Sequence, residues 1–234
     1  GPWSPKNYEK TFEGQVPLVQ ALAKSLNTAT VRVSEAAGRD AVRKVASDFG
    51  FAQNLADGPA LALGVSESTL IDMTGAYAGI LNGGSSVEPY GIVELKLQGD
   101  DTPLAGQEGG IGERVISENA DKQLIYMMNQ VIERGTGRRA RLDGYEAAGK
   151  TGTTSAARDA WFIGFTADYV ARVWMGYDDN RPLTGVTGGG LPAQIWQSVM
   201  TRVQKGLEPK PLPMARPTDM PLAPSYPGQV FYAN

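Results

Sequence analysis

The stretch Lys150-Thr151-Gly152-Thr153-Thr154, preceded by Ala147-Ala148-Gly149, decides how the rest of the chain is interpreted. It predicts a β-strand over 147–154 that carries one ammonium group and several hydroxyls, with a glycine where another backbone can come close. Such a strand can pair with an extended peptide along its edge, and its lysine and threonines can bind a carboxylate. A plain surface strand with β-favouring threonines and a glycine bulge would explain the same residues.

The composition excludes several kinds of active site. The chain has 234 residues, no Cys, no His and a net charge of −3. It therefore cannot build a thiol nucleophile, a disulfide, a Cys-ligated metal site or a Ser-His-Asp triad. The sequence has no run of basic residues that would indicate nucleic-acid binding. It also has no apolar stretch that approaches the roughly 18 residues of a membrane helix. An enzyme made from this chain must use Ser, Thr, Lys, Tyr or carboxylates, and we expect no metal and no cofactor.

Apolar residues spaced by three and four positions predict six helices. They begin at Pro17, Thr28, Asp40, Ser66, Ser117 and Pro192, and they end before Ser25, Gly38, Gly50, Gly83, Gly135 and Gly206. Ser66 and Ser117 are the predicted N-caps of their helices. In the last helix, five apolar side chains are expected to point inward: Ile195, Trp196, Val199, Met200 and Val203.

Alternating residues predict strands over 93–97, 160–165 and 169–177 in addition to 147–154. The first should have one apolar and one polar face, residues 98–113 should form turns, and 166–168 should close a hairpin. Trp161, Trp174 and Trp196 are expected in the core. Helices followed by strands and one more helix indicate an α+β fold, an antiparallel sheet flanked by helices.

A second candidate motif, Ser25-Leu26-Asn27, lies between the first two predicted helices. A Ser-x-Asn triplet is expected about once by chance in a chain of this length. Taken alone, the triplet is better explained as an interhelical turn with Asn27 as a cap.

The two motifs together resemble the transpeptidase domain of class A, bifunctional penicillin-binding proteins. That serine acyltransferase family is marked by Ser-x-x-Lys, Ser-x-Asn and Lys-Thr-Gly in this order. The resemblance extends over about residues 3–205, including 3–8, 18–33, 135–140, 159–166 and 192–196. It implies a penicillin-binding-protein or serine β-lactamase-like fold. It also implies peptidoglycan stem peptides and β-lactams as binding partners.

The resemblance also implies a role for each site residue. Ser25 would relay a proton to the leaving amine, Asn27 would hold the substrate amide, and Lys150 would act as a second cation and carboxylate anchor. The substrate-binding residues would be Thr151, Gly152, Thr153 and Thr154. The Thr153 N–H would form half of an oxyanion hole.

One departure concerns the nucleophile, because none of the twelve serines is followed by Lys three positions later. We therefore expect residues 1–206 to be the C-terminal portion of a transpeptidase domain without its nucleophile helix and first strands. Alone it would be inactive and would expose apolar surface where that helix packs, to be covered by the upstream part of the domain or by a second copy.

The remaining expectations concern the tail and the parent protein. Residues 207–234 hold seven of the fifteen prolines and should form an extended tail. The parent protein would be membrane-anchored and extracytoplasmic, at the periplasmic face of the inner membrane. The alternative function is a non-catalytic module that binds D-Ala peptides, β-lactams or a protein partner.

Overall fold

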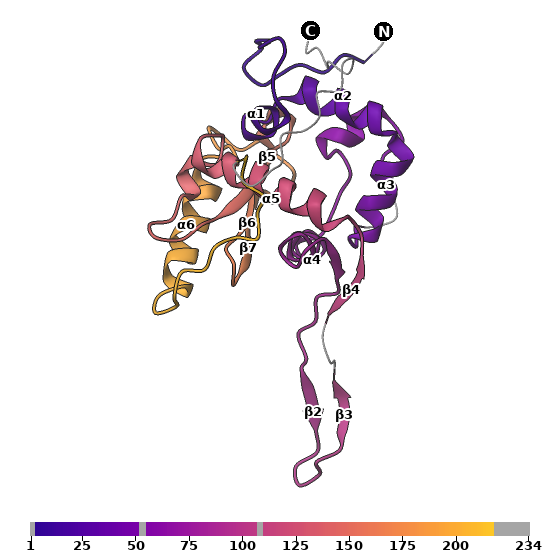
Figure 1. Cartoon of the computed structure of the whole chain (residues 1–234), viewed down its shortest axis with the longest axis vertical. Coiled ribbons are helices and arrows are strands. Elements are labelled where there is room, and N and C mark those ends of the chain that lie inside the picture. The colour runs from indigo at the N-terminus through magenta and orange to yellow at the C-terminus, as the bar shows by residue number, and fades with distance from the viewer. Residues whose placement is uncertain (1–2, 52–54, 107–109, 218–234) are drawn as a thin grey trace.

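A three-stranded antiparallel sheet lies at the centre of the fold (Figure 1). The computed structural model describes residues 3–51, 55–106 and 110–217. The sheet consists of β5 (Ala148–Thr153), β6 (Asp159–Phe165) and β7 (Val170–Gly176), in that order. All three strands lie where the sequence predicted strands. β5 is an edge strand among the described residues, so its other side has no strand partner.

The helix α6 (Leu191–Val203) covers one face of the sheet. Trp196 is fully buried, lies edge-on to Phe162 with ring centres 5.2 Å apart, and donates from its indole N–H to the carbonyl of Ala171. Of the five side chains expected to point inward, only Trp196 and Met200 are buried. The prediction was wrong for the other three, which are 37–47% exposed: Ile195, Val199 and Val203. A single helix touches a sheet along a narrow stripe, and these residues flank it.

The helices α4 (Leu70–Leu81) and α5 (Glu118–Glu133) pack against the other side of the sheet. Their apolar side chains meet Ala148 and Phe165 in a second buried cluster. Ser117 caps α5 as predicted, accepting from the backbone N–H of Ala120 at 3.3 Å. The predicted cap of α4 was wrong, because Thr69 caps it and Ser66 accepts a hydrogen bond from the Ala56 N–H instead.

Three helices form the N-terminal part: α1 (Leu18–Ala23), α2 (Asn27–Ala37) and α3 (Arg39–Asp48), followed by the short helix η1 (Pro59–Leu63). Gly38 ends α2 with φ of 90°, a backbone conformation that L side chains rarely adopt. α1, α2 and α3 lie where the sequence predicted them, within one or two residues at each end, whereas η1 was not predicted.

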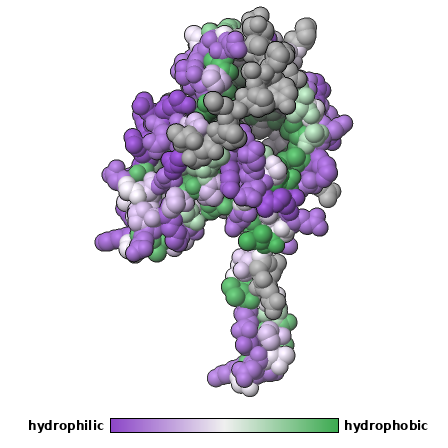
Figure 2. Space-filling view, in the orientation of Figure 1, coloured by the Kyte–Doolittle hydropathy of each residue, from purple (hydrophilic) through white to green (hydrophobic). Residues whose placement is uncertain are grey.

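An arm projects from the molecule between α4 and α5 (Figure 1). β1 (Ser85–Val87) pairs with β4 (Ile111–Arg114) at its base, and β2 (Glu94–Lys96) pairs with β3 (Pro103–Gly106) further out. Two of these strands lie where only turns were predicted. Leu95 and Leu97 are more than half exposed, so the expected apolar face of β2 covers no core. Figure 2 shows apolar surface along this arm.

The chain after Gly206 has no strand and no α-helix up to Arg216, as expected for an extended segment. It nevertheless packs on the domain. Leu212 is 4% exposed within the α4–α5 cluster, and its N–H donates to the Glu146 carboxylate at 2.9 Å. The division of the chain at residue 206 remains a prediction, and 218–234 lie outside the described residues.

Two more short helices, η2 (Arg138–Ala140) and η3 (Ser155–Ala157), flank β5 in the sequence. None of the helices within 3–51, 55–106 and 110–217 is both long enough and apolar enough to cross a membrane.

Candidate active site

Ser25 and Lys150 come together although 125 positions separate them. The Lys150 ammonium donates to Ser25 Oγ at 2.7 Å and to the Thr151 carbonyl at 2.9 Å. Burial lowers the pKa of Lys150 to about 8. A lysine that titrates near neutral pH beside a hydroxyl can exchange a proton with it or can bind an anion when charged.

The turn that carries Ser25 is strained. Ser25 has φ of 54°, in the left-handed region that non-glycine residues avoid. It follows α1, and its N–H donates to the Leu22 carbonyl while the Leu26 N–H donates to that of Ala21. These bonds hold the serine between α1 and α2 in a conformation that costs about 1–3 kcal/mol, and such strain is concentrated at functional sites.

Asn27 is the first residue of α2, two positions after Ser25. Its side-chain amide donates to the Lys6 carbonyl at 2.8 Å, and the neighbouring Thr28 N–H donates to the Asn7 side chain. The structure therefore places Asn27 beside the Ser25 turn and ties its amide to the segment at 6–7. No hydrogen bond joins it to Lys150.

The three threonines of the 150–154 stretch have different partners. The Thr151 hydroxyl lies 2.7 Å from that of Thr136, and the Thr153 hydroxyl accepts from the Gly188 N–H at 3.0 Å. The Thr154 hydroxyl accepts from the Asp159 N–H in the turn that leads to β6. Thr154 is thus separate from the Ser25–Lys150 pair, whereas Thr151 adjoins it along the strand.

Gly152 is the close-approach position that the sequence indicated. A Cβ added there would lie 3.3 Å from the Trp161 Cβ, and one added at Gly188 would overlap the Gly152 carbonyl. The backbone that approaches this glycine is therefore the chain's own loop at 187–190. Sequence reasoning missed Thr136 and Gly188, although the runs Gly135-Thr136-Gly137 and Gly188-Gly189-Gly190 signal close packing.

Aromatic and cationic side chains lie on the same sheet face as Lys150. Cross-strand pairing aligns Lys150 with Ile163 and Arg172, and Gly152 with Trp161 and Trp174. The Arg172 guanidinium stacks 4.8 Å from the Trp161 ring centre, and burial lowers its pKa to about 10. Trp174 is 36% exposed, so its expected place in the core was wrong.

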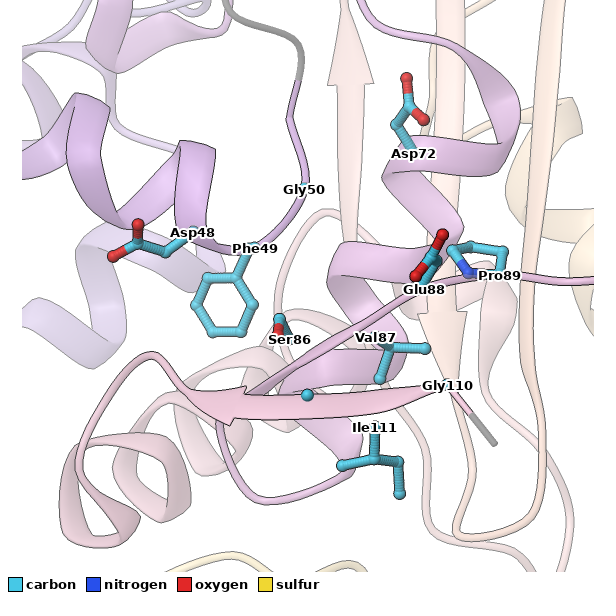
Figure 3. Close-up of a pocket in the computed structure, with 11 residues that line it drawn as sticks. Asp48, Phe49, Gly50, Asp72, Ser86, Val87, Glu88, Pro89, Gly110 and Ile111 are labelled. Atoms are coloured by element: carbon cyan, nitrogen blue, oxygen red, sulfur yellow. The ribbon is translucent and has the colours of Figure 1, made fainter. Parts of the chain in front are cut away.

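A cavity of about 400 Å³ lies elsewhere, between α3, α4 and the β1–β4 pair (Figure 3). Phe49, Val87 and Pro89 line it together with acidic side chains, and Figure 3 shows the Asp48 carboxylate pointing away from it. None of the site residues predicted from the sequence lines this cavity. The Ser25–Lys150 pair is at the edge of the central sheet instead.

Comparison with known proteins identifies the family of the chain. Residues 1–201 match the family described as the penicillin binding protein transpeptidase domain. Penicillin-binding protein 1A of Aquifex aeolicus is 34% identical over 204 residues, and that of Rickettsia conorii is 32% identical over 225. Penicillin-binding protein 1B of Haemophilus influenzae is 33% identical over 205 residues. Each match covers 86–87% of this chain but only 26–28% of the relative.

Solved structures show the same fold. Penicillin-binding protein 1A from Haemophilus influenzae aligns with a TM-score of 0.79 and 27% identity, over 90% of this chain and 37% of that one. PonA1 from Mycobacterium tuberculosis aligns with a TM-score of 0.80 and 24% identity, over 97% of this chain and 66% of that one. The α+β fold and the resemblance to class A proteins are thereby confirmed. The chain belongs to the penicillin binding protein transpeptidase domain family.

Proposed function

We propose that this chain supplies two of the three active-site motifs of a serine D,D-transpeptidase. Such an enzyme transfers the acyl group of a peptidoglycan stem peptide ending in D-Ala-D-Ala to an amine of a neighbouring stem. The observation that carries the proposal is the 2.7 Å hydrogen bond from Lys150 to Ser25, which joins the two motifs in one site.

The proposed reaction has two acyl-transfer steps. A serine hydroxyl attacks the carbonyl between the two D-Ala residues, the C–N bond breaks, and the terminal D-Ala leaves with a proton relayed through Ser25. The acceptor amine then attacks the acyl-serine, releasing the serine hydroxyl and forming the crosslink. A β-lactam would acylate the same serine, because its ring amide mimics the D-Ala-D-Ala bond.

Each site residue has a proposed role in these steps. Charged Lys150 attracts the terminal carboxylate, and the hydroxyls of Thr151 and Thr153 donate to it. Asn27 holds the substrate amide, and the Thr153 N–H contributes to the oxyanion hole, where the loss of one donor costs about 3–4 kcal/mol. Gly152 packs closely against the loop at 187–190 and adds no side chain that would obstruct a peptide along the edge of β5. Thr154 lies at the end of this binding edge.

The nucleophile and the partner are part of the same proposal. No serine of these 234 residues stands in a Ser-x-x-Lys motif. We propose that a segment with this motif, from the same domain or from a second copy, covers the face of Trp161 and Trp174. Because its proposed substrates are stem peptides of the cell wall, we propose that the working protein acts outside the cytoplasm, at the periplasmic face of the membrane.

Covalent labelling by a fluorescent penicillin tests the proposal. We expect the product of the complete gene to be labelled and the 234-residue chain not to be labelled. In the gene product, Lys150→Ala should slow labelling at least a hundredfold, whereas the exposed Lys205→Ala should not change it. An unchanged rate for Lys150→Ala would reject the role of that residue.

Two other outcomes separate the alternatives. Labelling of the 234-residue chain itself would contradict the missing nucleophile. A gene product that binds penicillin reversibly and is never labelled would instead support a non-catalytic binding module.

A further inference from the structure

Thr136 contacts both segments that form the Ser25–Lys150 pair. Its backbone N–H donates to the Ala23 carbonyl at 3.0 Å, and its hydroxyl lies 2.7 Å from the Thr151 hydroxyl. Ala23 is two positions before Ser25, and Thr151 follows Lys150 directly. Thr136 therefore connects the turn of one motif to the strand of the other.

Close backbone packing fixes the place of this threonine. A Cβ added at Gly135 would overlap the Ala23 carbonyl, and one added at Gly189 would overlap the Thr136 carbonyl. The backbone at 135–136 is thus held between the end of α1 and the loop at 187–190. Because the backbone has no room to shift, the Thr136 hydroxyl has a defined position beside Thr151.

Proton positions in the hydroxyl pair follow from simple counting. Two hydroxyls that share one hydrogen bond use one proton between the two oxygens and leave the other proton free to donate elsewhere. If Thr151 donates to a ligand carboxylate, Thr136 must be the donor within the pair. Donation from Thr136 then polarises the Thr151 hydroxyl and makes it a stronger donor.

We propose that Thr136 is a positioning residue that makes Thr151 a carboxylate donor and so favours peptides with a free C-terminal carboxylate. The inference rests on the proposed function, since it assigns the ligand group that this part of the site recognises. Thr136 lies outside both motifs. Its proposed role adds to the selectivity for a peptide's C-terminal carboxylate that the charge of Lys150 already provides.

Three variants of the gene product test this role. Thr136→Val removes the hydroxyl and keeps both the β-branched shape and the backbone N–H. Thr136→Ser keeps the hydroxyl. The matched control is Thr201→Val, on the exposed side of α6, whose hydroxyl donates to the Gln197 carbonyl.

The measurement is equilibrium binding of two peptides by calorimetry, N-acetyl-D-alanyl-D-alanine and its C-terminal amide. The wild type should prefer the free carboxylate, and Thr136→Val should reduce this preference roughly three- to tenfold, because a hydrogen bond to a charged group is weakened. Thr136→Ser and Thr201→Val should retain the preference.

Weaker binding of both peptides by the same factor would show a merely structural role and overturn the inference. An unchanged preference in Thr136→Val, or no preference in the wild type, would also overturn it. Penicillin labelling of the wild type is recorded separately. A protein that prefers the carboxylate and is not labelled would retain this inference while rejecting the acyl-transfer function.

Discussion

Replacing Lys150 by Met should stabilise the protein at neutral pH while removing the cation from the site. Burial lowers the folded-state pKa from 10.5 to about 8, so the charged lysine costs about 3 kcal/mol of unfolding free energy at pH 7. This cost is present in full below pH 8 and disappears as the pH rises toward 10.5. Methionine avoids it but loses the hydrogen bonds to Ser25 and Thr151, worth about 1 kcal/mol each.

The cost of the buried charge depends on pH, whereas the loss of the hydrogen bonds does not. The stability difference between Lys150→Met and the wild type should therefore change sign across the pH range. Lys150→Met should be about 1 kcal/mol more stable than the wild type at pH 7 and about 1–2 kcal/mol less stable near pH 10.5. Urea unfolding followed by tryptophan fluorescence across this range measures the difference. The exposed Lys205→Met is the control and should show no such crossing. A stability difference for Lys150→Met that stays constant with pH would refute the buried, weakly basic lysine.

Gly135→Ala should destabilise the protein by about 1–3 kcal/mol, because its new methyl group overlaps the Ala23 carbonyl. Gly91→Ala is the control, because a methyl group added there has open space around it. An equal loss of stability in both variants would exclude the overlap with Ala23 as the cause. Burial raises the pKa of Asp121 to about 6, so the stability it contributes below pH 4 is lost as the pH rises through 6. Between pH 4 and pH 8, the stability of Asp121→Asn relative to the wild type should therefore increase by about 1–2 kcal/mol. Thermal unfolding at each pH measures this difference, and a difference that does not change with pH would contradict the prediction. Leu212→Ala should lower the free energy of unfolding, measured in urea, by about 2–4 kcal/mol, because the Leu212 side chain is buried. No change would show that the segment after Gly206 does not pack on the domain.

Most helices and strands were predictable because their signals are local. α5 has a capping serine, an apolar repeat and a glycine after its end, and all three lie within one segment of sequence. The cap of α4 was misassigned because Ser66 and Thr69 are both capping residues, and only the contact of Ser66 with Ala56 decides between them. The exposure of Val199 and Trp174 depends on which neighbours reach them, and that is a tertiary property.

The site was predictable to the extent that its residues belong to motifs. The resemblance carried by Ser25-Leu26-Asn27 and Lys150-Thr151-Gly152 implied that these residues act in one site, and the structure brings Ser25 and Lys150 into contact. The hydrogen bond between Thr136 and Thr151 could not be predicted in the same way. It depends on how the chain after α5 lies against β5, which no local pattern determines.

The separation of Ser25 and Lys150 also sets when the site can form during synthesis. At about 5–20 residues per second, the ribosome adds the lysine strand on the order of ten seconds after the serine turn. Until then the strained turn lacks the ammonium group that it will contact, and closing a loop of 125 positions must wait for the later strand. Any ligand that requires both groups will therefore distinguish chains that already contain the lysine strand from shorter nascent chains.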